Sequence, residues 1–293
     1  MAKGWYLIID VASCENCYNC VLATKDEYIG NEFPGYSAPE PKLGHHWIRI
    51  ERKVRGSGPM VDAAYMPTTC NHCDNAPCVK AGGGAVTRRP DGIVLISPEK
   101  AQGRRDLVAS CPYGAIWWNE ELQLPQKWTF DAHLLDAGWK TTRGAQACPT
   151  RTINPVYLEE AEMQERVRKE SLRVLRPELG TRPRVYYRNL HRFDSVFIGG
   201  TVVAQTTATE LDCVADATVV LSSGGKEFAR TRTDAFGEFK FDGLDCGSGA
   251  YSVNVEHERW GAARAETTLG ESCYLGVLRL AAGAAGASAQ HRH

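Results

Sequence analysis

Eleven cysteines are the residues of this 293-residue chain whose spacing indicates chemistry. Eight of them lie in the first half, as two triplets and two single residues that each precede a proline. The triplets have the spacings C-x2-C-x2-C and C-x2-C-x4-C, and the full set is Cys14, Cys17, Cys20, Cys70, Cys73, Cys78, Cys111 and Cys148. Thiolates are ligands of zinc and of iron–sulfur clusters. The pattern therefore predicts metal centres.

Three kinds of cysteine chemistry compete at these positions. Disulfides need an oxidising compartment, and C-x2-C-x2-C is too tight for independent bridges. Zinc prefers paired C-x2-C knuckles, although a triplet with a distant single cysteine also supplies four thiolates. A cubane [4Fe–4S] cluster fits best, because a tight triplet reaches three corners and a Cys-Pro elsewhere in the chain reaches the fourth. We predict two such clusters and keep a non-redox, zinc-stabilised scaffold as the alternative. The spacing leaves open which single cysteine joins which triplet.

Composition and charge narrow the class of protein. The chain has 34 basic and 35 acidic side chains, a balance that argues against a nucleic-acid partner, which would need a basic face. It contains no apolar run of the roughly 18 residues that would predict a membrane span. Residues 1–10 resemble a short strand and lack the features of a signal peptide. We therefore expect a cytoplasmic protein.

The chain divides by composition into segments with different patterns. Residues 156–176 are charged and predict a helix that Pro177 stops, and residues 177–195 predict an extended linker. Short alternating strands between Gly and Asp turns then predict an antiparallel β-sandwich. The expected fold class is α+β, a ferredoxin-like double [4Fe–4S] module followed by an Ig-like sandwich. The expected segments are 1–155 (iron–sulfur domain), 156–195 (helix and linker), 196–280 (β-sandwich) and 281–293 (disordered tail).

The first 190 or so residues resemble the four-cluster ferredoxin subunits that accompany molybdopterin oxidoreductases of the dimethyl-sulfoxide-reductase superfamily. In that family four cysteine motifs pair first with fourth and second with third. The resemblance implies one cluster on Cys14, Cys17, Cys20 and Cys148, and another on Cys70, Cys73, Cys78 and Cys111. It also implies two lost sites, since other residues stand at the remaining motif positions: Thr24 with Trp128, Asp131 and Gly144, and Gly82 with Ala101, Arg104 and Leu107.

A narrower resemblance covers nearly the whole chain. Segments 31–36, 46–52, 111–114 and 176–187, with the predicted sandwich around 223–227 and 236–241, are similar to the small subunits of pyrogallol–phloroglucinol transhydroxylases and resorcinol hydroxylases. This chain departs at the fourth motif, where that family keeps cysteines. The resemblance implies one cluster fewer here than in the transhydroxylase.

The resemblance also implies a function and a partner. It makes this chain a non-catalytic electron-transfer subunit, and we name no catalytic residue in it. Molybdopterin is expected on a large catalytic partner subunit that hydroxylates or transhydroxylates phenolic rings, with a higher oligomer of heterodimers as a further expectation. The alternatives are the electron-transfer subunit of another reductase or dehydrogenase of the superfamily and the zinc scaffold.

Several residues near the motifs have structural interpretations. We expect His72 to donate a hydrogen bond to a sulfur or the backbone, and His45, His46 and Trp47 to lie on a strand leading to Arg49 and Arg52. Trp117 and Trp118 are expected in a core or interface. We expect Arg104 or Arg105 to fill one lost cluster site with a guanidinium, and Trp128 to fill the other by bulk. Cys213, Cys246 and Cys273 are expected as small sandwich residues without a disulfide.

Overall fold

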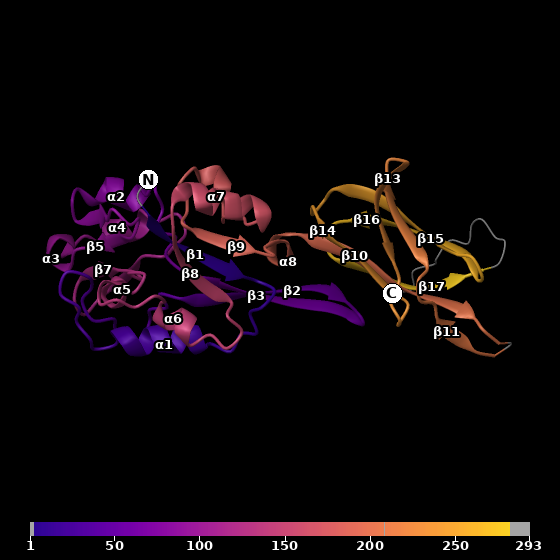
Figure 1. Cartoon of the computed structure of the whole chain (residues 1–293), viewed down its shortest axis with the longest axis horizontal. Coiled ribbons are helices and arrows are strands. Elements are labelled where there is room, and N and C mark those ends of the chain that lie inside the picture. Colours follow the sequence, from indigo (N-terminus) through magenta and orange to yellow (C-terminus); the bar gives the residue numbers. More distant parts are fainter. Residues whose placement is uncertain (1–2, 208, 282–293) are drawn as a thin grey trace. The chain divides into compact units, whose positions relative to one another are not determined.

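The computed structural model describes residues 3–207 and 209–281 and divides the chain into two units. Unit 1 comprises the chain up to Arg52 together with Ala64–Leu190, and unit 2 comprises Lys53–Ala63 together with the chain from His191 onward. Strands predominate and short helices accompany them, so the fold class is α+β (Figure 1). Among the described residues, no helix combines the length and apolarity needed to cross a bilayer.

Unit 1 contains short elements separated by the cysteine loops. Its strands are β1 (Gly4–Asp10), β4 (Val86–Arg88), β5 (Val94–Ile96), β6 (Trp117–Asn119), β7 (Leu124–Gln126), β8 (Ile153–Leu158) and β9 (Val185–Arg188), with the base of the hairpin β2 (Arg49–Ser57) and β3 (Met60–Thr68). Its helices are α1 (Asn19–Tyr28), α2 (Pro77–Gly82), α3 (Pro98–Ala101), α4 (Asp106–Ala109), α5 (Ala132–Asp136), α6 (Arg143–Gln146), α7 (Glu160–Lys169) and the 3-10 turn η1 (Pro177–Leu179).

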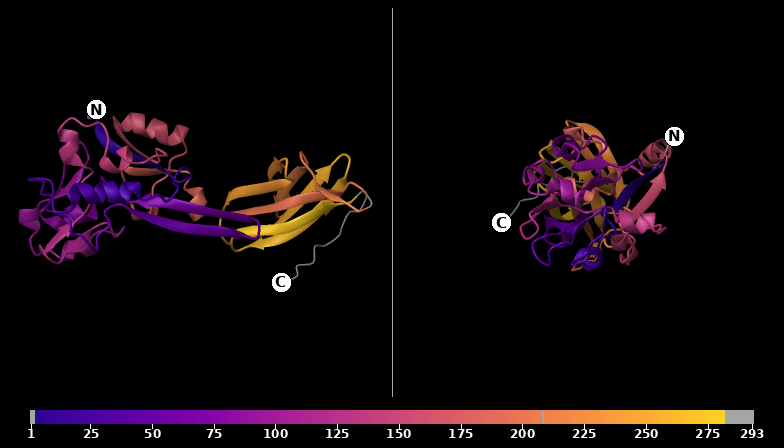
Figure 2. Two further views of the ribbon diagram at one scale, coloured as in Figure 1. Left: turned by 90° about the horizontal axis from the view of Figure 1, so that it is seen from below. Right: turned by 90° about the vertical axis from the view of Figure 1, so that its left-hand side faces the viewer.

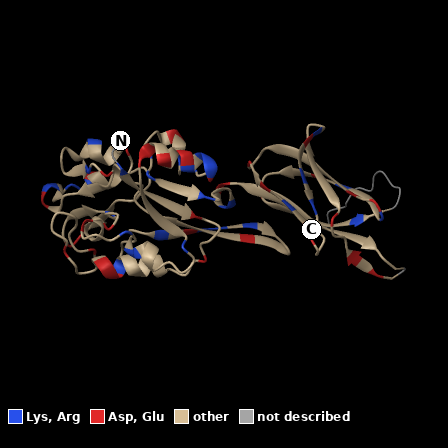
Figure 3. Ribbon diagram, viewed as in Figure 1, with Lys and Arg blue, Asp and Glu red and all other residues tan. Residues whose placement is uncertain are grey.

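The central sheet of unit 1 has the order β8-β1-β9, with β1 antiparallel to β8 and parallel to β9 (Figure 1). Residues 6–9 of β1 are almost fully buried, and Tyr6 and Ile8 pack against Met163 of α7. Glu159 and Glu162 form a capping box that begins α7. Figure 3 shows acidic residues toward the start of this helix and basic residues toward its end, the polarity that complements the helix dipole.

Two expectations for residues 156–195 were wrong. The predicted helix over 156–176 is only Glu160–Lys169, because residues 153–158 pair with β1 and the chain turns at Ser171, whose φ is 51°. The predicted linker over 177–195 contains β9, which hydrogen-bonds to β1, and α8 (His191–Asp194). Pairing with β1 decided the structure of residues 153–158 and 185–188, although the local sequence had suggested a helix and a linker there. The chain up to Leu190 therefore belongs to unit 1.

Unit 2 is built from two four-stranded sheets that share one apolar core (Figure 2). Its strands are β10 (Val196–Gln205), β11 (Leu211–Cys213), β12 (Thr218–Ser223), β13 (Lys226–Arg232), β14 (Glu238–Leu244), β15 (Gly249–His257), β16 (Gly261–Leu269) and β17 (Cys273–Leu280). The predicted turn at residues 222–225 joins β12 to β13, with Gly224 and Gly225 both at positive φ. The sandwich is not wholly antiparallel as expected, because β17 runs parallel to β10. The predicted disordered tail lies outside the described residues except for Ala281, which bridges to Ala262.

The tip of the β2–β3 hairpin belongs to unit 2 through a buried charge cluster. The Arg55 side chain is 3% exposed and donates to Asp242 Oδ1 at 2.6 Å and to Asp62 Oδ2 at 2.7 Å. Arg192 also donates to Asp62. Burial alone would raise the pKa of Asp62, but the hydrogen bonds from Arg192 and Arg55 outweigh it and hold that pKa at about 2.

We predict a pH-dependent penalty for Asp62→Asn. The ionised carboxylate is favoured in the folded chain, so it contributes stability above the ordinary pKa near 3.8, and this contribution disappears as the pH falls toward 2. The variant should lower the unfolding free energy of unit 2 by about 2 kcal/mol at pH 7. The difference from wild type should shrink between pH 4 and pH 2.

Calorimetry of the unit 2 transition in the full chain measures this penalty. Glu227→Gln is the matched control, because Glu227 pairs with Arg230 on the exposed face of β13 and should leave the transition unchanged. A penalty for Asp62→Asn that is the same at every pH would contradict the prediction.

Candidate metal centres

The first predicted set of cysteines is brought together by the pairing of β1 with β8. Ile9 lies opposite Ile153, so the loop after β1, with Cys14, Cys17 and Cys20, meets the turn before β8 that carries Cys148. Electrostatic coupling joins Cys14, Cys17 and Cys148 to the thiol of Cys20. Cys20 begins the buried side of α1, and α1 packs beside α6 (Figure 1). The thiols of Cys14, Cys17, Cys20 and Cys148 thus lie near one another.

The second set lies after β3 and along α2 and α4. Cys70 and Cys73 occupy the loop after β3, Cys78 lies in α2, and Cys111 follows α4. Pro77 starts α2, where its missing N–H is not needed. Electrostatic coupling joins Cys73 to Cys70, Cys111 and Cys78. Each triplet is therefore joined to one single cysteine, Cys148 in the first set and Cys111 in the second.

Burial raises the pKa of several of these thiols, so that without a metal they stay protonated. Burial and then the neighbouring cysteines raise the pKa of Cys20 and of Cys73 to about 12, and that of Cys78 to about 11. The exception is Cys148, whose pKa is lowered because hydrogen bonds from Thr150, Thr152 and Ile153 outweigh its burial. Four thiolates can be held together at such a site only when a cationic centre compensates their charge.

Backbone N–H groups aim at the two single cysteines. The N–H of Thr152 donates to Cys148 Sγ at 3.2 Å, and the N–H of Ala115 donates to Cys111 Sγ at 3.5 Å. Such bonds to sulfur stabilise negative charge on a cluster and raise its potential. The proline after each cysteine favours the turn that follows.

The arrangement fits a cubane better than a mononuclear zinc site. Tetrahedral zinc, with Zn–S bonds of about 2.3 Å, would bring its sulfurs within roughly 3.8 Å of one another. Within residues 3–207 and 209–281, no three His, Cys, Asp or Glu side chains converge on a point that could hold a single ion. A cubane requires no such point, because each thiolate binds a different corner.

The first lost cluster site is filled by a polar core centred on Asp131. This fully buried carboxylate accepts from the Tyr28 hydroxyl at 2.7 Å, Trp128 Nε1 at 2.8 Å and the Arg143 N–H at 2.7 Å. Trp128 itself is fully buried, as expected for a residue that fills the site by bulk. At the same place a Cβ on Gly144 would lie 3.4 Å from Thr24 Oγ1 and 3.5 Å from Cys20 Cβ, so Thr24 and Gly144 adjoin the first cysteine set.

The second lost site is filled by apolar side chains. Ala101 and Leu107 are fully buried in one core with Val86, Cys73 and Cys78. A Cβ on Gly82 would lie 2.7 Å from Val86, which explains the glycine. The expectation that Arg104 or Arg105 fills this site was wrong. Arg104 lies at the surface, where it donates to the Ala81 carbonyl and pairs with Asp106, and Arg105 pairs with exposed Glu120.

Two histidine expectations also need correction. His72 does not donate to the backbone: its Nδ1 accepts from the Val94 N–H at 3.0 Å, and its ring packs edge-on against Trp128 and Phe130. Residues 45–47 are irregular, and the strand begins at Arg49 because His45 Nε2 instead lies 3.0 Å from the Trp118 carbonyl. Trp117 packs near the His45 and His46 rings.

Lys127 is the residue near the second set that the sequence analysis did not identify. Its side chain is buried, and its Nζ donates to the Val94 carbonyl at 2.5 Å and to the Trp128 carbonyl at 3.1 Å. The ammonium lies close enough for its charge to act on Cys78 and Cys111. The sequence alone does not predict that Lys127 is buried, because its burial depends on β5, which supplies the Val94 carbonyl that accepts its hydrogen bond.

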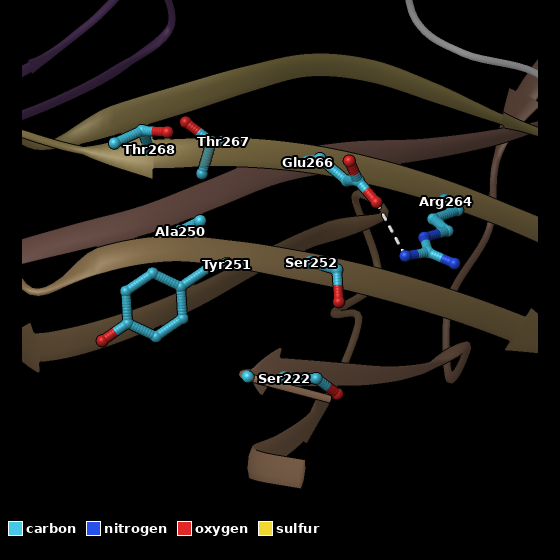
Figure 4. A pocket seen from close by; sticks show the side chains of 9 residues that line it. Ser222, Ala250, Tyr251, Ser252, Arg264, Glu266, Thr267 and Thr268 are labelled. Carbon is cyan, nitrogen blue, oxygen red and sulfur yellow. Dashed lines mark hydrogen bonds and ion pairs between the residues drawn. The ribbon is translucent and has the colours of Figure 1, made fainter. Parts of the chain in front are cut away.

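Unit 2 contributes none of the eight cysteines. Its Cys213, Cys246 and Cys273 are free thiols, with the first two exposed. A hollow on the sheet formed by β12, β15 and β16 is lined by hydroxyl groups, among them Ser222, Ser252 and Thr268, beside the Arg264–Glu266 ion pair (Figure 4).

Comparisons with known proteins point to iron–sulfur subunits. Residues 61–157 match the family described as "4Fe-4S dicluster domain". The chain is 45% identical to the "Pyrogallol hydroxytransferase small subunit" of Pelobacter acidigallici over 95% of this chain and 100% of that one. It is 26% identical to the arsenate respiratory reductase iron–sulfur subunit ArrB of Shewanella sp. (62% of this chain, 94% of that one). It is also 26% identical to the thiosulfate reductase electron transfer subunit PhsB of Salmonella typhi (56% and 81%).

We predict that Trp128→Ala destabilises unit 1 by about 3–5 kcal/mol, because it leaves a cavity in a site that holds no cluster. Trp128→Phe should cost less, since it keeps most of the volume and removes only the hydrogen bond to Asp131. Thermal unfolding of the cluster-loaded chain measures both. An unchanged melting temperature for Trp128→Ala would show that this side chain does not fill the site.

Proposed function

Because the chain belongs to the iron–sulfur small-subunit family of dimethyl-sulfoxide-reductase-type molybdopterin oxidoreductases, together with the pyrogallol hydroxytransferase small subunit, we propose that it connects a molybdopterin catalytic subunit to an electron carrier during phenol oxidation. The chain is an electron-transfer subunit that carries [4Fe–4S] clusters. Cubanes of this kind, when bound, pass one electron at a time.

The proposal assigns two clusters to the two four-cysteine sets. Cys14, Cys17, Cys20 and Cys148 would hold the first cluster, and Cys70, Cys73, Cys78 and Cys111 the second. Two observations carry this assignment: the β1–β8 pairing and α1–α6 packing bring the first triplet beside Cys148, and Cys111 packs against the core that contains Cys73 and Cys78. The protein's own groups would exclude water from the second set and direct N–H groups to the sulfurs of both single cysteines.

The phenolic substrate class is supported by how much of the chain each relative matches. The arsenate and thiosulfate reductase subunits match only 62% and 56% of this chain, whereas the pyrogallol hydroxytransferase subunit matches 95%. We propose a large molybdopterin-binding partner that hydroxylates or transhydroxylates a phenolic ring, in the cytoplasm. Side chains fill both sites that the resemblance implies as lost, which supports two clusters in this chain and no further one.

Cysteine variants test the assignment of ligands. Cys148→Ala and Cys111→Ala should each abolish the electron paramagnetic resonance (EPR) signal of one reduced cluster and lower bound iron by about four atoms per chain. Cys213→Ala is the control, because this exposed thiol belongs to neither set. Adding Cys14→Ala to Cys148→Ala should cause no further loss of iron, whereas adding it to Cys111→Ala should remove the first cluster as well. The reverse pattern would contradict the assignment.

A phenol added to the native complex tests the direction of electron flow. A net hydroxylation releases two electrons from the substrate, so resorcinol or pyrogallol added without oxygen or acceptor should reduce the clusters of this chain. The EPR intensity of reduced clusters measures this, and phenol-free buffer is the control. Hydroxylated product formed with the clusters still oxidised would indicate a redox-neutral transfer instead. Neither product nor reduction with any phenol would overturn the proposed substrate class.

A further inference from the structure

Lys127 is a buried lysine beside the core that holds the second cysteine set. It is 3% exposed, and among residues 3–207 and 209–281 its ammonium contacts carbonyl oxygens and forms no ion pair with a carboxylate. Its hydrogen-bond partners are two neutral carbonyls, those of Val94 and Trp128. Burying an ammonium without a negative partner is costly, and a lysine in such a place usually loses its charge or has an anion nearby.

The cysteines of the second set supply anionic groups near this ammonium. Its charge favours the thiolates of Cys78 and Cys111, and Val94 shares an apolar core with Cys73 and Cys78. The backbone of Val94 binds both neighbouring polar side chains, because its N–H donates to His72 Nδ1 and its C=O accepts from Lys127 Nζ. Val94 thus links Lys127 to the core that holds the second set.

The first set has a different electrostatic environment. The charge from outside the set that acts on Cys14 is the acidic side chain of Glu15. Cys17 is exposed and Cys14 and Cys148 are partly exposed, so water solvates this site. In the second set Cys70, Cys73 and Cys78 are all buried. Burial by itself would make the second cluster harder to reduce, because an added electron increases the negative charge in a low-dielectric site.

We infer that the Lys127 ammonium is a fixed countercharge for the cluster held by the second cysteine set, and that it raises that cluster's reduction potential above the potential of the first. The inference rests on the proposed cluster assignment. An electron entering this chain would then reside preferentially at the second set, next to the buried lysine. Lys127 is a tuning residue and makes no bond to iron.

Redox titration of the intact complex, followed by EPR, tests the inference. Lys127→Gln removes the charge and keeps an amide that can donate to the two carbonyls. It should lower the potential of the second cluster by the equivalent of at least a tenfold change in its reduction equilibrium, about 59 mV for one electron. The first cluster should titrate as in wild type, and Lys127→Arg should restore most of the lost potential. Arg104→Gln, which removes an exposed cation near α4, is the control and should change neither wave.

An unchanged second wave in Lys127→Gln, or an equal shift of both waves, would overturn the inference, because a purely structural lysine would affect stability and not one potential. If Lys127→Gln fails to assemble the cluster, the order of the two potentials in the wild-type complex tests the inference. The wave that disappears in Cys111→Ala identifies the second cluster, and it must be the one of higher potential. A wild-type chain without iron–sulfur signals would instead refute the proposed function.

Discussion

Unit 1 depends on bringing together thiols that cannot all ionise beside one another without a cation between them. Burial and mutual repulsion raise the pKa of Cys20 and Cys73 to about 12, so the metal-free chain has no favourable way to charge these groups. The β1–β8 pairing, with Ile9 opposite Ile153, nevertheless holds the ends of the first site together. Cluster assembly and the folding of unit 1 are therefore coupled, as they are at other metal sites made of buried cysteines.

The two positions that the resemblance implies as lost cluster sites are filled without metal in different ways. One has a carboxylate, Asp131, with three hydrogen-bond donors around it. The other has Leu107 and Val86 in an apolar core next to Cys78. In the first site the buried Asp131 carboxylate is hydrogen-bonded, and in the second site the buried side chains are apolar. The two cysteine sets lie in different surroundings, because only Cys20 of the first set is buried, whereas in the second set all but Cys111 are buried.

Much of the site could be predicted from the chain, because the cysteine spacing indicates two triplets and two Cys-Pro residues, and the family resemblance implies how they pair. The strand predicted within residues 1–10 is present as β1 (Gly4–Asp10), and the Gly224–Gly225 turn was confirmed, both for local reasons. Features that depend on distant partners could not be predicted. The β9 strand exists because β1 offers it an edge, β17 is parallel to β10 because the chain crosses over between them, and Lys127 is buried because β5 provides a carbonyl.

The central claim, that two cubanes occupy two sets of four thiolates, is tested most directly by elemental analysis of the native complex purified without oxygen. Iron, acid-labile sulfide and zinc would be measured per copy of this chain, after subtraction of any cluster found in the separated large subunit. We predict about eight iron and eight sulfide, four of each per cubane, and no stoichiometric zinc. Zinc without sulfide, or about twelve iron in this chain, would contradict the account.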